Sequence, residues 1–155
     1  MKLLVREAEF GDAELLAPRL RAADRQEIAA ASGEHPLTAL HHGFSLSEPA
    51  FTIEGPDGLA GMFGVVPSGQ IGVPWLLGSD DIRKHRREFL ERAPLWFKAV
   101  SCTYAHLANW IDERNELHIR WIRWLGFSIT GRDPHFGHEG RPFLYFEWHY
   151  NSDDV

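Results

Sequence analysis

The chain has 155 residues, enough for one domain, and its 44% hydrophobic content and six tryptophans can fill a core. Its net charge of −6 argues against nucleic acid as the main partner, because phosphate binding needs a broad basic surface. Cys102 is the single cysteine, so no internal disulfide can form. No run approaches the roughly 20 apolar residues that span a membrane, and we expect one domain over residues 1–150 with a frayed polar tail, 151–155.

The first third of the chain predicts one strand and three short helical segments: Leu3–Glu9, Ala13–Ala23, Asp24–Ala31 and Pro36–His42. Asp12 suits a helix cap, because its carboxylate can accept from free amides of the first turn. Pro18 should kink the first helix or delay its start, because proline lacks the N–H that an interior turn donates.

Three strands with short connections follow: Phe44–Glu54, Leu59–Val66 and Ile71–Leu77. The stretch Gly55–Gly58 reads Gly-Pro-Asp-Gly, a strong turn signal. The connections are too short for helical crossovers, so these strands should pair antiparallel. Pro74 implies an edge position, a bulge or a splayed point in the last of them.

A long helix should begin at Ser79 or Asp80, with a basic outer face from Arg83 to Arg92, and should bend or break at Pro94. A strand, Tyr104–Ile111, should precede the amphipathic helix Asn115–Phe127. Asn115 can cap that helix, and Gly126 can end it in the left-handed conformation. The remaining segments are predicted as a strand, a loop and a strand: Ser128–Thr130, Gly131–Arg141 and Pro142–Tyr150.

The predicted order is β-αα-βββ-α-β-α-ββ, an α/β (α+β) fold with a mixed, mostly antiparallel sheet and helices on both faces. That order, and the run from Asn115 to Gly126-Phe127, resembles the GNAT fold of acetyl-CoA-dependent N-acetyltransferases. The resemblance implies that acetyl-CoA binds at the turn after the fourth strand and implies a tyrosine proton donor on the last helix.

The residues at those two positions depart from the GNAT pattern. The turn Leu76–Ile82 has one glycine and adds Asp80 and Asp81, whose charges disfavour an anion. The tyrosine position is Ile122, which cannot donate a proton. Candidate replacements are Tyr104 and His118 for catalysis, and candidate cofactor-binding residues are Asn115, Leu77, Gly78 and Ser79. Asp133, His135, His138 and Glu139 have side chains that can bind a metal, but they lie in a predicted loop where such side chains are usually solvated. No metal site is therefore predicted.

A closer resemblance is to the internal (core) virion proteins of short-tailed bacteriophages and prophages. It is carried by Val73–Ser79 running into the basic segment Arg83–Arg87, and by Asn115–Arg120 followed by Leu125-Gly126. It implies a role in particle assembly, other virion or assembly proteins as partners, and a location in the bacterial host cytoplasm or the virion interior.

Three functions follow from these patterns. The main expectation is a non-catalytic phage internal virion or assembly protein that binds other proteins and no cofactor. The alternative is a divergent acetyl-CoA-dependent N-acetyltransferase that uses Asn115 with Tyr104 or His118. The third is a sensor that binds an acyl cofactor in a groove between strands 71–77 and 104–111.

Overall fold

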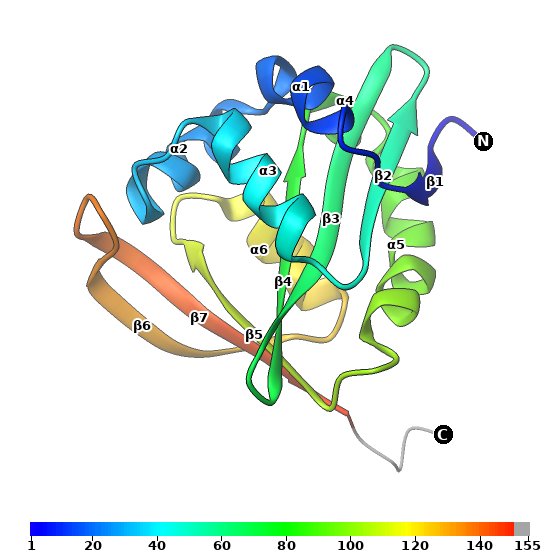
Figure 1. The fold of residues 1–155 in the computed structure, drawn as a ribbon. Coiled ribbons are helices and arrows are strands. Elements are labelled where there is room, and N and C mark those ends of the chain that lie inside the picture. The colour runs from blue at the N-terminus through cyan, green and yellow to red at the C-terminus, as the bar shows by residue number, and fades with distance from the viewer. Residues whose placement is uncertain (151–155) are drawn as a thin grey trace.

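The computed structural model describes residues 1–150, which form one seven-stranded sheet in the order β1-β2-β3-β4-β5-β7-β6 (Figure 1). The strands are β1 (Leu4–Glu7), β2 (Ala50–Gly55), β3 (Gly58–Ser68), β4 (Ile71–Gly78), β5 (His106–Asp112), β6 (Ser128–Phe136) and β7 (Arg141–His149). Each neighbouring pair is antiparallel except β4 with β5, which is parallel. The expected mixed, mostly antiparallel sheet is confirmed, while the expected tail at 151–155 lies outside the described residues.

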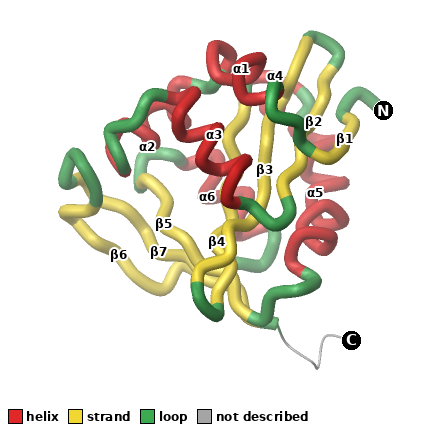
Figure 2. The backbone as a smooth tube through the Cα atoms, in the orientation of Figure 1, coloured by secondary structure: helices red, strands yellow, loops and turns green. Residues whose placement is uncertain are grey.

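Helices cover both faces of the sheet, as predicted (Figure 2). They are α1 (Asp12–Leu16), the 3-10 turn η1 (Ala17–Arg19), α2 (Ala22–Ala31), α3 (Pro36–Leu46), α4 (Asp80–Lys84), α5 (Arg86–Ser101) and α6 (Glu116–Trp124). The first three helices pack on one face, and α5 and α6 pack on the other. Within residues 1–150 no helix is long and apolar enough to cross a membrane.

The core is divided by the sheet because successive strand residues point to opposite faces. In β3, Met62 packs with the α1–α3 layer, and its neighbour Phe63 packs with the α5–α6 layer. Pro18 acts as predicted: α1 ends at Leu16, and the chain continues as η1. Both layers contact β4, one of the two strands of the parallel pair.

The long basic helix breaks at a different residue from the one predicted. The break is at His85, between α4 and α5, whereas Pro94 lies inside an unbroken α5. Proline cannot donate to the carbonyl four residues earlier, which here is that of Leu90. Trp124 Nε1 of α6 donates to this carbonyl oxygen at 2.9 Å. The indole thus satisfies the group that Pro94 leaves free, so α5 can continue.

Other predicted boundaries also shift. The segment from Phe44 belongs to the end of α3, and β2 begins only at Ala50, because Phe44 packs with the core under α1–α3. Strand β6 extends to Phe136, well into the predicted loop, because its residues pair with β7. Cys102, the single cysteine, is exposed. Gly126 ends α6 with a φ of +98°, as predicted.

Candidate functional site

The parallel strands β4 and β5 separate soon after they begin. Their ladder contains one Cα pair, Gly72 with Leu107, and Pro74 follows without an N–H to continue it. Asn109 Nδ2 of β5 donates to the carbonyl oxygen of Pro74 at 2.7 Å, which bridges the opening. Pro74 therefore marks a splayed point, one of the three predicted meanings of this proline. The carboxyl ends of the two strands are left apart, where α/β folds commonly bind ligands.

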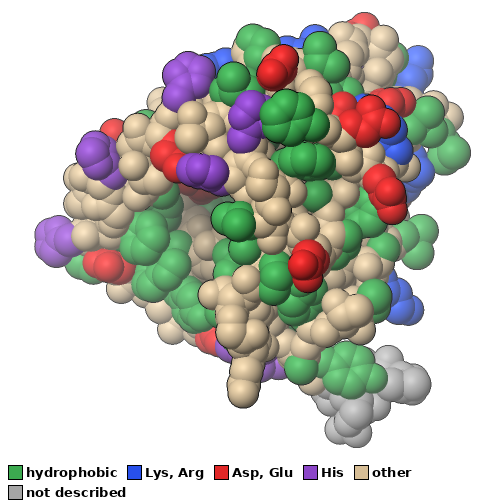
Figure 3. Space-filling model, in the orientation of Figure 1, with side chains coloured by type: hydrophobic (Ala, Val, Ile, Leu, Met, Phe, Trp, Pro, Cys, Tyr) green, Lys and Arg blue, Asp and Glu red, His purple; other side chains and the backbone are tan. Residues whose placement is uncertain are grey.

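A cavity of about 520 Å³ lies at this opening. Its volume falls within the range of roughly 300–1,000 Å³ that small-molecule sites occupy. In the space-filling view, hydrophobic, acidic and histidine side chains border a hollow on the face that carries α2 and α3 (Figure 3). Most of the lining is apolar, including Trp75, Leu77, Phe89, Trp96, Trp110, Trp121, Ile122 and Phe127. Five polar residues join them: Glu27, Glu34, His42, Asn109 and His118.

Glu27 of α2 is the carboxylate with the most unusual environment in this cavity. Its Oε1 accepts from the backbone N–H of Asp112 at 2.9 Å, and Asn115 Nδ2 lies 3.5 Å from the same oxygen. Burial raises the pKa of Glu27 to about 8, and repulsion from the nearby carboxylate of Asp24 adds to the rise. A carboxylate with such a pKa can accept a proton near neutral pH.

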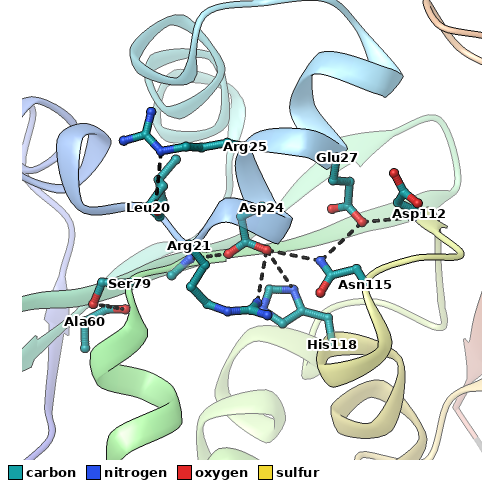
Figure 4. A network of polar contacts seen from close by, with 11 residues as sticks. Leu20, Arg21, Asp24, Arg25, Glu27, Ala60, Ser79, Asp112, Asn115 and His118 are labelled. Carbon is teal, nitrogen blue, oxygen red and sulfur yellow. Dashed lines mark hydrogen bonds and ion pairs between the residues drawn. The ribbon is translucent and has the colours of Figure 1, made fainter.

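Asp24 joins three elements beneath the cavity (Figure 4). Its side chain is fully buried and accepts from the Gly78 amide at 2.9 Å, Asn115 Nδ2 at 3.1 Å and Arg21 Nη1 at 3.3 Å. These contacts connect α2, the end of β4 and the start of α6. A buried carboxylate with this many donors fixes the relative positions of the elements that carry it.

His118 of α6 also contacts this network and lines the cavity. Its Nδ1 lies 3.5 Å from Asp24 Oδ1, and its Nε2 is buried without a hydrogen-bond partner in the described chain. Burial lowers the pKa of His118 and outweighs the opposing effect of Asp24. The ring is therefore neutral at pH 7, and the acceptor beside Nδ1 favours the tautomer that leaves Nε2 a free acceptor.

Asn115 does not cap α6, so that prediction is wrong. Its side chain makes no capping bond and instead donates between Asp24 and Glu27. It is buried and lies outside the cavity lining, and its Oδ1 has no partner among residues 1–150. Two carboxylates on α2 compete for its amide, which explains why the local cap is not formed. Asn115 thus orients Glu27 from behind the cavity wall.

The turn expected to hold a cofactor has its backbone amides directed inward. The Gly78 amide donates to Asp24, and the Ser79 amide donates to the carbonyl oxygen of Ala60 at 2.9 Å. Ser79 Oγ caps α4 by accepting from the Asp81 amide at 3.3 Å. The Asp81 carboxylate is buried against Arg19 at 2.5 Å. Of the turn candidates, Leu77 lines the cavity, whereas Gly78 and Ser79 serve as internal connections.

Tyr104 and His118 are not brought together. The Tyr104 hydroxyl donates to the carbonyl oxygen of Glu48 at 2.8 Å, and the residue precedes β5, at the closed end of the splay. Burial raises its pKa. Neither Glu27 nor Asp24 was among the site residues predicted from the sequence. The two residues are three positions apart, so both carboxylates lie on one side of a helix that also presents Ile28 to the core. This spacing is the feature of the sequence that could have identified them as a pair.

Several solved acetyltransferase structures share this fold. An acetyltransferase of the GNAT family from Bacillus anthracis matches with a TM-score of 0.70 and 14% identity, covering 96% of this chain and 95% of that one. Ribosomal-protein-alanine N-acetyltransferase from Brucella melitensis matches with a TM-score of 0.72 and 18% identity, covering 95% and 99%. Spermidine N-acetyltransferase from Vibrio cholerae, in complex with CoA and spermine, matches with a TM-score of 0.65 and 14% identity, covering 96% of this chain and 95% of that one.

These likenesses establish the GNAT fold. No family model matches the chain, and no curated protein matches it in sequence. The main expectation, a non-catalytic phage internal virion or assembly protein, is wrong, because the structural neighbours are GNAT acetyltransferases and include a CoA complex. They favour the alternative expectation, an N-acetyltransferase. The two blocks that carried this resemblance, Val73–Ser79 and Asn115–Arg120, are short and lie on β4 and at the start of α6, both within the fold shared with the acetyltransferases.

Proposed function

We propose that this protein is an acetyl-CoA-dependent N-acetyltransferase that transfers an acetyl group to an amine. The observation that carries the proposal is the cavity at the β4–β5 splay, which has Glu27 in its wall. An apolar cavity whose wall carries a half-buried carboxylate with a raised pKa suits an amine that must lose a proton before it attacks. The GNAT fold of the chain supports the same reaction class.

The cavity fits the acetyl and pantetheine arm of the donor. Beyond Gly72 no ladder pair joins β4 to β5, so an extended ligand can lie between the two strands, although the Pro74 carbonyl oxygen is already bonded to Asn109. Apolar side chains such as Trp96 and Trp121 suit the thioester end. The donor supplies the activated acetyl group, while this chain binds it and handles the proton of the acceptor.

The diphosphate of the donor does not fit a backbone cradle here, because the amides of Gly78 and Ser79 are already bonded within the protein. The exposed cations that follow the turn can supply the charge instead. Arg83 and Arg86 are exposed and form no ion pair within residues 1–150, whereas Lys84 is 3.5 Å from Asp81. We therefore assign diphosphate binding to the Arg83 and Arg86 guanidinium groups.

The proton transfer is assigned to Glu27. Its ionised carboxylate takes a proton from the acceptor ammonium group, and the neutral amine then attacks the thioester carbonyl carbon. A C–N bond forms, the C–S bond breaks, and the acylated nitrogen releases its remaining extra proton, which solvent carries to the thiolate of CoA. Glu27 returns its own proton to solvent. Asn115 and the Asp112 amide orient the Glu27 carboxylate and act as positioning groups.

A cationic acceptor suits the face of the cavity under α2 and α3. Glu34 lines the cavity together with Glu27, and its Oε1 lies 2.8 Å from His42 Nδ1. Trp75 and Trp110 add aromatic faces, which attract cations. These features support a primary amine that is protonated in solution.

The test is release of free thiol from acetyl-CoA in the presence of a panel of primary amines. The wild type should release thiol in an amine-dependent, saturable way. Glu27→Gln, which keeps the size and one acceptor oxygen, should lose activity by about 10² or more, whereas Glu14→Gln at an exposed position of α1 should retain it. Absence of amine-dependent release across the panel would contradict the proposal.

A further inference from the structure

Two histidines and a glutamate converge on one face of the sheet, away from the cavity. Strand alternation puts Glu147 and His149 on the same side of β7. The register places His106, the first residue of β5, directly opposite His149. The three side chains thus come from two adjacent strands that are fixed by a continuous antiparallel ladder.

The donor atoms are spaced as metal ligands are. His106 Nε2 lies 2.9 Å from Glu147 Oε1, and His149 Nε2 lies 3.5 Å from the same oxygen. The two imidazole rings stack with centroids 4.1 Å apart. Tetrahedral zinc with bonds of about 2.0–2.1 Å separates its ligand atoms by roughly 3.3 Å. The observed separations lie on either side of that value. Because the rings are stacked with an interplanar angle of 20°, they must turn out of this stack for both nitrogens to bind one ion.

A neighbouring residue orients the carboxylate. Thr130 Oγ1 of β6 donates to Glu147 Oε2 at 2.5 Å, which leaves Oε1 directed at the two imidazoles. Such outer hydrogen bonds are the usual support of metal-binding carboxylates. The His149 side chain is 65% exposed, so an ion can reach the cluster from solvent. In residues 1–150 no other group of three histidine, cysteine or acidic side chains converges in this way.

We propose that His106, Glu147 and His149 form a binding site for a divalent transition metal ion, with Zn²⁺ as the best match. Two imidazole nitrogens and one carboxylate oxygen are the donor set that Zn²⁺ accepts when a fourth position stays open to water. No metal site was predicted from the sequence, in which Asp133, His135, His138 and Glu139 were the only ligand-type cluster considered. Those residues lie around the β6–β7 turn and do not converge.

The site is separate from the proposed reaction. Residues His106 and Asp112 lie at opposite ends of β5, about 20 Å apart at 3.3 Å per residue. A metal there would join the first residue of β5 to the last of β7, at the closed end of the splay. The proposal therefore stands or falls independently of acetyl transfer.

The test is titration of Zn²⁺ into the full chain by calorimetry, with protein that carries no affinity tag and has been freed of metal with a chelator. The wild type should bind one equivalent. His106→Gln and His149→Gln should each weaken binding by at least about tenfold, because each removes one of three ligands. His135→Gln removes an exposed histidine outside the cluster and should bind as the wild type does.

Co²⁺ gives a second readout, because its visible absorption reports coordination geometry. Bands of a four- or five-coordinate ion should appear with the wild type and His135→Gln and should be absent with His106→Gln and His149→Gln. Circular dichroism should show that all variants remain folded. No saturable Zn²⁺ binding, or binding that survives the double replacement of His106 and His149, would overturn the proposal and leave the cluster a hydrogen-bonded ion pair.

Discussion

The backbone amide of Gly78 donates a hydrogen bond to the carboxylate of Asp24 at 2.9 Å, although 54 residues separate them in the chain. Because of this bond, the Gly78 amide is not available to hydrogen-bond an anionic ligand at the turn after β4. It also anchors α2, so that Glu27, one turn further along, reaches the cavity wall. The same contact therefore accounts for the inward-facing turn and for the position of the proposed base.

Replacing Asp24 with asparagine should destabilise the protein by about 3 kcal/mol, because Arg21 loses its buried counter-charge and an amide cannot accept from all the present donors. The free energy of unfolding in urea, measured near neutral pH, checks this. Asp57→Asn, at the exposed β2–β3 turn, should change it by less than 0.5 kcal/mol. Equal stability of the two variants would show that the Asp24 network contributes little.

Activity should follow the ionisation of Glu27. Because its pKa is raised to about 8, kcat/KM should increase with pH and level off above that value, since the base must be deprotonated. For Glu27→Gln, kcat/KM should not show this increase with pH and should be at least about 10²-fold lower than that of the wild type. A wild-type profile that is flat between pH 6 and 9 would assign the proton transfer to another group.

The same group should make stability fall as pH rises. The pKa of Glu27 is about 8 in the folded state against an ordinary 4.5, so the folded protein binds more protons between these values and loses stability as pH increases through them. Unfolding free energies of the wild type and Glu27→Gln, measured from pH 5 to 9, test this sign. The wild type should lose stability relative to the variant with rising pH, and an unchanged difference would contradict the shift.

Removing the cations beyond the turn should weaken binding of acetyl-CoA. Arg83→Ala and Arg86→Ala together should raise its KM by about tenfold or more, equivalent to at least one charged hydrogen bond. The kcat/KM for a short acetyl thioester without phosphates should stay unchanged. Lys98→Ala, near the other end of α5, serves as the matched control. If the double replacement lowers kcat/KM equally for acetyl-CoA and for the short thioester, the arginines do not contact the diphosphate.

A phenol at the cavity wall should assist departure of the thiolate. Ile122 lines the cavity on α6 and occupies the position that the GNAT resemblance assigns to a tyrosine. Ile122→Tyr should raise kcat above that of Ile122→Phe, which has the same ring without the hydroxyl. Equal kcat values would mean that the hydroxyl cannot reach the sulfur, or that departure of the thiolate does not limit the rate.

Much of the fold was predictable because its signals are local. The turn Gly55–Gly58 forms the predicted β2–β3 hairpin, and Gly126 ends α6 as expected. Pro74 predicted an irregularity in β4. It could not predict that β4 separates from β5 there, because that depends on the position of β5. The continuity of α5 through Pro94 could not be foreseen, because the indole that donates to the freed carbonyl oxygen of Leu90 comes from 34 residues away.

The site was less predictable because long-range pairings create it. Asn115 reads locally as a cap, yet its amide is engaged by Asp24 and Glu27, about 90 residues earlier. The raised pKa of Glu27 comes from burial and from Asp24, neither of which the sequence displays. The turn at Gly78 was correctly seen as rich in carboxylates, but a third carboxylate, that of Asp24, is the one its amide contacts.

The central claim is acetyl transfer at the β4–β5 splay, and mass spectrometry of the acceptor amine after incubation with isotope-labelled acetyl-CoA tests it most directly. The account predicts labelled N-acetylated amine with the wild type and at least 10²-fold less with Glu27→Gln, both proteins being folded by circular dichroism. Labelled product formed equally by both proteins would refute the assignment of Glu27. No labelled amine from the wild type would contradict the claim itself.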